Sequence, residues 1–205
     1  MKPQLHAKCL TYDFKTLFEK KGYAFFTKGN YNVNIIGVRS NQGGKVTNAY
    51  DDLLIIDYNT KTGHKRQIYT ITTEPGLSLI KKPSNSKGTA ILVPGQYRGV
   101  YKVDLHNGKY KALCQRLGSV KVYRDGNKDN IYDYNPGSID TGWFGINIHR
   151  SNETWTRNTI DNYSAGCQTF NDPKEFAAFM RIIEKSKAIY GNKFTYTLIN
   201  EEDLV

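Results

Sequence analysis

One cysteine of this chain stands in a context that favours chemistry over packing. Cys167 follows Gly166 in the polar stretch YSAGCQTF, whereas a structural cysteine is usually buried among apolar neighbours. A cysteine nucleophile needs a base to take its proton and donors for the developing oxyanion. His149 ends the strand-like segment GINIHR, and the polar loop SNETWTRNTIDNY returns the chain from there toward Cys167. This pattern predicts a catalytic pair, with Cys167 as the nucleophile and His149 as its base.

Two residues beside the cysteine are expected to support it. Gly166 permits tight backbone geometry, so we expect the amides of Gly166 and Cys167 to point at one oxygen. Ser164 is a candidate for a supporting hydrogen bond, with an ordinary loop serine as the alternative. A single histidine or cysteine is most often structural, and only the combination of His149 with S-x-G-C indicates catalysis.

The elements that must position these residues are mostly strands. Apolar alternation, as in QIYTITTEPG, predicts a mainly β fold in one domain, residues 1–205. A short N-terminal helix is expected over residues 12–21, before Gly22. A long helix after the cysteine is expected from Pro173 to the stop at Gly191, with an apolar stripe along one face.

Composition and charge limit the function classes. The 205 residues are 39% hydrophobic and 23% charged, which suits a folded domain and excludes a disordered chain. The net charge of +10 indicates an anionic partner. Nucleic acid and anionic cell-wall polymers are both candidates. The basic residues are scattered and form no basic helix or arm, which disfavours nucleic acid and leaves a wall-associated or simply soluble basic surface.

Neither a membrane helix nor a secretory signal is expected. No apolar run approaches the ~18 residues of a membrane helix, and the start MKPQLHAKCL lacks the apolar segment of a signal peptide. The chain is therefore expected to be cytoplasmic at synthesis, and either to work in the cytosol or to leave it by lysis, in a particle or by another route.

The cysteine count disfavours a metal site. Three cysteines form no complete disulfide set, and the absence of C-x-x-C argues against thiolate zinc binding, so no metal or cofactor is expected. A disulfide between Cys9 and Cys114 remains open, which would leave Cys167 free. The segment Asp125–Asp133 resembles a calcium loop, but Asn130 and Pro136 stand where a glycine and a glutamate are required, which favours a polar turn.

His149 followed by S-A-G-C resembles the signature of YkuD-type L,D-transpeptidase catalytic domains. The stretch DDLLIIDYNTKTGHKRQIYTITTEPG is similar to their strand meander, and the resemblance covers residues 50–199, with an N-terminal helix and strands in residues 1–49. It implies a β-sandwich-like fold and a thioester formed between Cys167 and a peptidoglycan stem peptide. The acyl group would then pass to an amine or to water.

The resemblance also implies roles for neighbouring residues. In the family a backbone carbonyl just after the histidine orients the imidazole, and here that carbonyl belongs to Arg150. The Arg150 side chain would then be free for a stem-peptide carboxylate, and Asn147 and Tyr97 are the other candidates for substrate binding. Three positions depart from the family pattern: Arg150 replaces a glycine, Ala165 a histidine and Thr169 an arginine.

Two alternatives compete with this interpretation. His106 is a second candidate base, in an arrangement like that of sortases, but no T-L-x-T-C precedes Cys167. The other alternative is a basic wall-binding module or virion structural protein without catalysis.

Overall fold

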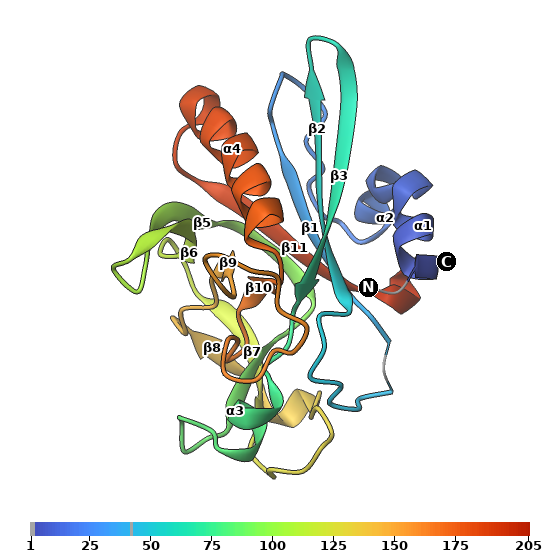
Figure 1. Ribbon diagram of the computed structural model, residues 1–205. Coiled ribbons are helices and arrows are strands. Elements are labelled where there is room, and N and C mark those ends of the chain that lie inside the picture. The colour runs from blue at the N-terminus through green and yellow to red at the C-terminus, as the bar shows by residue number, and fades with distance from the viewer. Residues whose placement is uncertain (1–2, 42) are drawn as a thin grey trace.

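A computed structural model describes residues 3–41 and 43–205 and shows a mainly β protein (Figure 1). The mainly β prediction is confirmed. The strands are β1 Asn34–Arg39, β2 Asp52–Thr60, β3 Gly63–Thr72, β4 Thr89–Leu92, β5 Gly95–His106, β6 Tyr110–Gln115, β7 Val120–Asp125, β8 Asp140–Gly142, β9 Ile148–Arg150, β10 Gln168–Phe170 and β11 Phe194–Asn200. The α-helices are α1 Pro3–Thr11, α2 Phe14–Lys20, α3 Leu77–Lys81 and α4 Pro173–Tyr190, and short 3-10 turns are Pro136–Ser138 and Glu201–Asp203.

Eight strands close into a barrel in the order β1-β11-β5-β6-β9-β10-β3-β2, and β4, β7 and β8 form a separate three-stranded sheet. The sandwich-like arrangement expected from the family resemblance is therefore not confirmed. Most neighbouring strands are antiparallel, whereas β1 runs parallel to β11 and β9 runs parallel to β10. Because β1 pairs with both β2 and β11, residues 1–49 contribute a strand to the same barrel as the rest of the chain.

The N-terminal region holds two helices where the sequence predicted one. Asp13 separates them, because its side chain accepts a hydrogen bond from the Thr16 amide and so caps α2. The apolar residues of α2 that gave the helical pattern, Phe14, Leu17 and Phe18, pack against β1 and β2 in a core of their own. Both helices lie on the side of the barrel formed by β1 to β3 (Figure 1).

Helix α4 follows the cysteine, as the sequence predicted. The Asp172 side chain caps its first turn, and the helix ends at Gly191, whose φ of 86° favours glycine. Its buried stripe enters the main core of the barrel through Phe176, Phe179, Met180 and Ile183. Among the described helices, none is long and apolar enough to span a membrane.

Candidate active site

The parallel pair β9 and β10 brings the cysteine beside the histidine. Thr169 is in register with His149, and the ladder continues one step further, since the Gln168 amide donates to Asn147 O (2.9 Å). Because side chains alternate along a strand, the side chain of Cys167, two residues before Thr169, lies on the same face of the sheet as those of Thr169 and His149. The Asn147 amide donates to Cys167 Sγ at 3.4 Å. The structure thus places Cys167 and His149 on adjacent chain segments of one face.

Hydrogen bonds fix the tautomer of His149. Its Nδ1 lies 2.8 Å from the carbonyl oxygen of Arg150, and because a carbonyl only accepts, Nδ1 carries the proton. The Tyr110 hydroxyl donates to the same carbonyl at 3.0 Å and lies 3.3 Å from Nδ1. Nε2 therefore has the lone pair that a general base requires. Burial, together with the neighbouring His106, lowers the pKa of His149 to about 3, so the ring is neutral at physiological pH.

His106 lies in the same site and not in a competing one. Its ring stacks on His149 with centroids 4.1 Å apart and an interplanar angle of 17°. Its Nδ1 is 3.0 Å from the Asn147 side-chain nitrogen, which links it to the residue whose amide bonds the thiol. The sequence treated the two histidines as alternatives, because the pairing of β5, β6 and β9 that joins them is not visible in a local pattern.

The thiol itself is in a resting arrangement. Cys167 Sγ donates to the Gly145 carbonyl at 3.4 Å, while His149 Nε2 faces the Thr169 hydroxyl at 3.3 Å. Burial raises the pKa of the Cys167 thiol to about 11, against the opposing effect of the Asn147 amide. At neutral pH the thiol is therefore protonated, and it is bonded to Gly145 O rather than to His149.

This state predicts a steep pH dependence of thiol reactivity. We expect iodoacetamide to modify Cys167 slowly at pH 7 and about tenfold faster for each added pH unit, up to the region of the pKa near 11, because only the thiolate attacks. Peptide mapping of timed, quenched samples distinguishes Cys167 from Cys9 and Cys114. A Cys167 rate that is already constant between pH 7 and 8 would show a thiolate in the free protein and contradict this description.

Ser164 holds the cysteine loop, as expected of a supporting residue. Its hydroxyl donates to Cys167 O at 2.9 Å and accepts from the Gly166 amide at 3.2 Å. The expectation that the Gly166 and Cys167 amides share one oxygen is therefore wrong, because the Gly166 amide is bound to Ser164. The Cys167 amide remains as the backbone donor for an oxyanion.

Position 166 requires glycine for a steric as well as a conformational reason. Its φ is +108°, and a Cβ there would lie 2.0 Å from the carbonyl oxygen of Ala90. We expect Gly166→Ala to lower the free energy of unfolding by about 3 kcal/mol, since backbone must move. Gly145→Ala is the matched control, because Gly145 also has a positive φ (+69°) but nothing within 4 Å of a Cβ, and should cost about 1 kcal/mol. Urea denaturation measures both, and equal losses would contradict the steric argument.

The candidate substrate-binding residues have different surroundings from those expected. Tyr97 lies in the main core, and its hydroxyl donates to Val93 O at 2.6 Å, so it lines no groove. Asn147 is buried and accepts from the Gln115 amide at 2.9 Å, which makes it a positioning residue. The Arg150 side chain covers the Tyr110 ring at 4.3 Å and forms an ion pair with exposed Glu153 at 3.2 Å. Arg150 lines a cavity of about 490 Å³, together with Tyr110 and Met180.

A cavity of about 310 Å³ adjoins the cysteine loop and was missed by sequence reasoning. Ala165, in the cysteine loop, lines this cavity, and so do Trp143 and Phe144. These two aromatic residues directly precede Gly145 in the sequence, whose carbonyl accepts from the thiol. Trp143 is 62% exposed, and Arg124 lies over the Phe144 ring at 4.6 Å. The dipeptide Trp-Phe directly before GINIHR was the available signal, because large aromatic side chains next to a catalytic segment are suited to binding a ligand.

The remaining sequence hypotheses concern cysteines and metals. All three cysteines are free; Cys9 belongs to the N-terminal core and Cys114 to the main core, so the disulfide left open is not formed. In the segment that resembled a calcium loop, Asp125 accepts from the Asp133 amide (3.2 Å) and Asp129 from the Ile131 amide (2.7 Å), which are the bonds of a polar turn. Within residues 3–41 and 43–205, no three His, Cys, Asp or Glu side chains gather in a way that could hold a metal ion.

Comparison of the chain with protein-family models, with curated proteins and with solved structures finds no match.

Proposed function

We propose that the chain is a cysteine acyltransferase or peptidase of the L,D-transpeptidase type, acting on peptidoglycan stem peptides. The observation that carries the proposal is the Arg150 carbonyl at 2.8 Å from His149 Nδ1, which leaves Nε2 as a base on the face that also carries Cys167. The S-x-G-C loop that presents Cys167 supports the same reaction. Membership of the L,D-transpeptidase family, with its sandwich-like fold, is part of this proposal.

The reaction uses the residues in order. Substrate binding turns Sγ away from Gly145 O, and His149 Nε2 takes the thiol proton as Thr169 releases that nitrogen. The thiolate adds to the carbonyl carbon of a stem-peptide amide, and the Cys167 amide donates to the oxyanion. The carbon–nitrogen bond breaks, His149 returns the proton to the leaving amine, and a thioester remains. An amine or water then attacks the thioester carbon and passes its proton to His149. The carbon–sulfur bond breaks, His149 returns the proton to the departing sulfur, and the product leaves as a new amide or a free carboxyl group.

The stem peptide is placed in the cavity between Trp143 and Ala165. We expect Trp143→Ala to raise KM by about tenfold with little change in kcat, because the indole contributes binding area and no chemistry. Leu117→Ala, which removes another exposed apolar side chain, is the control and should leave both constants unchanged. Steady-state kinetics on soluble muropeptides measure kcat and KM separately. A loss confined to kcat would contradict substrate binding in this cavity.

The net charge of +10 suits an enzyme that works against anionic wall polymers. Delivery after lysis or in a phage particle is part of the proposal. The alternative is a basic wall-binding module without turnover. The observation that favours it is the resting arrangement, in which Sγ donates to Gly145 O while His149 Nε2 faces the Thr169 hydroxyl.

Incubation with purified sacculi distinguishes the enzyme from the wall-binding module. The enzyme should change the muropeptide profile seen by mass spectrometry, through either new cross-links or trimmed stem peptides. Protein that sediments with sacculi and leaves the profile unchanged over a day would overturn the catalytic proposal in favour of the binding module.

A further inference from the structure

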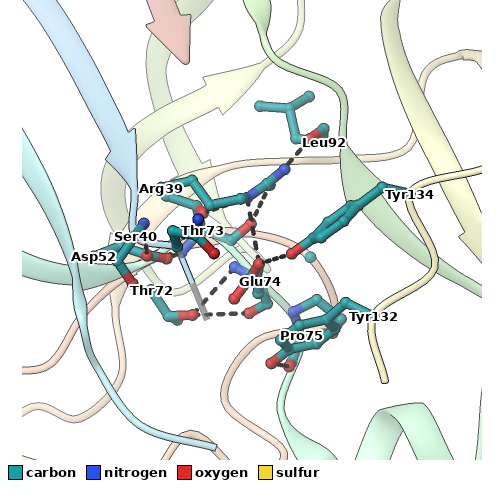
Figure 2. Close-up of polar contacts among 12 residues, drawn as sticks. Arg39, Ser40, Asp52, Thr72, Thr73, Glu74, Pro75, Leu92, Tyr132 and Tyr134 are labelled. Atoms are coloured by element: carbon teal, nitrogen blue, oxygen red, sulfur yellow. Dashed lines mark hydrogen bonds and ion pairs between the residues drawn. The ribbon is translucent and has the colours of Figure 1, made fainter. Parts of the chain in front are cut away.

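A second site lies where the barrel meets the three-stranded sheet, at the end of β1. The Arg39 side chain is only 5% exposed, yet it lines a cavity of about 410 Å³. Thr73 and Leu92 hold its guanidinium by hydrogen bonds (Figure 2). Nε donates to Thr73 Oγ1 (3.0 Å), and Nη2 donates to Thr73 O (3.1 Å) and Leu92 O (3.0 Å). These bonds leave Nη1 as the guanidinium nitrogen available to an oxygen in the cavity.

The charges around Arg39 are balanced. Asp52 accepts hydrogen bonds from the Ser40 amide and from the amide and hydroxyl of Thr73. Glu74 lies 3.4 Å from Arg39 Nε and accepts from the Tyr134 hydroxyl (Figure 2). Burial, reinforced by Asp52 and Asp51 and opposed by Arg39 and Tyr134, raises the pKa of Glu74 to about 8. The carboxyl groups of Asp52 and Glu74 both lie beside Arg39 and offset its positive charge, so the cavity suits a neutral ligand rather than an anion.

The cavity walls combine aromatic and polar side chains. The rings of Tyr123 and Tyr134 meet edge to face with centroids 5.7 Å apart, and Pro94 adds a further apolar surface. At the rim lies Glu202, an exposed carboxylate. A volume of this size, with apolar rings and a few convergent polar groups, is typical of a small-molecule site.

We propose that this cavity binds a neutral N-acetylated sugar ring, whose acetamido oxygen accepts from Arg39 Nη1. The apolar C–H face of the ring packs on Tyr123, and ring hydroxyls donate to Glu202. Neither Cys167 nor His149 lines this cavity, so the inference goes beyond the proposed catalysis and does not rest on it.

The test is a titration of the Cys167→Ala protein with N-acetylglucosamine, followed by amide chemical shifts in NMR spectra. Using Cys167→Ala removes catalysis from the measurement. We expect saturable shifts at the cavity residues Gly44 and Asn200, and no comparable shifts at Gly166. Glucose, which lacks the acetamido group, should bind at least about tenfold more weakly, in line with the loss of a hydrogen bond to a charged donor.

Two variants make the test specific. Tyr123→Leu should weaken binding about fivefold or more, since it keeps apolar bulk but removes the ring, and its own spectrum reports whether the fold is retained. Glu202→Gln, at an exposed position, should weaken binding without affecting the fold. The absence of saturable shifts at the cavity, equal affinity for glucose, or unchanged affinity in both variants would each overturn the proposal.

Discussion

Cys167→Ala is expected to abolish the processing of sacculi while the protein stays folded. Alanine keeps the backbone of the S-x-G-C loop and removes the only atom that can form the thioester. The loop bonds made by Ser164 do not use the thiol, so they persist in the variant. The measurement is the muropeptide profile after equal incubation with wild type and variant, with circular dichroism as the check on folding.

The other two cysteines are the matched controls for this loss. Cys9 and Cys114 are buried in separate apolar cores, where each acts as a small hydrophobe. Cys9→Ala and Cys114→Ala should cost some stability and leave turnover largely intact. A Cys167→Ala protein that still processes sacculi, or a Cys114→Ala protein that folds and does not, would exclude the assigned nucleophile.

His149→Ala is expected to lower turnover by ~10²-fold or more, the usual contribution of a general base. No other described side chain combines a fixed Nδ1–H bond to a carbonyl with an Nε2 lone pair on the face of Cys167. The loss should appear in kcat and in kcat/KM together, because the base acts in the transition state. Steady-state kinetics on soluble muropeptides provide both constants.

His106→Gln is the control for this variant. It removes the stacked imidazole and keeps a side chain able to bond Asn147, so we expect less than about a tenfold loss. The reverse ranking, with His106→Gln inactive and His149→Ala active, would assign the base to His106 and support a sortase-like arrangement.

The part of the site that sequence could predict is the part carried by local motifs. Ser164, Gly166 and Cys167 lie within four residues, and the Arg150 carbonyl follows His149 directly, so their mutual bonds depend little on the rest of the fold. The structure adds Tyr110 and Trp143, and it brings His106, which the sequence offered only as an alternative base, into the same site. These residues reach the site through strand pairing and through the turn before β9. Their contribution depends on register between distant strands, which no local pattern encodes.

The elements of the fold that sequence could predict are likewise those with local signals. Helix α4 has a capping aspartate, Pro173 and an apolar stripe, and its bounds follow from these local signals. Helix α1 buries only Leu5 and Cys9, which is too weak a stripe to identify from sequence. Closure of the barrel rests on β1 pairing with β11, strands from opposite ends of the chain. A family resemblance that began at residue 50 could not include β1.

The most direct test of the central claim is the site of covalent modification by a carbapenem, whose strained lactam mimics the stem-peptide carbonyl, as the resemblance to L,D-transpeptidases implies. Intact-protein mass spectrometry at neutral pH should show one added drug mass, peptide mapping should place it on Cys167, and His149→Ala should acquire it at least about tenfold more slowly. An unmodified Cys167, or a His149→Ala protein that is acylated as fast as wild type, would contradict a Cys167 thiol activated by His149.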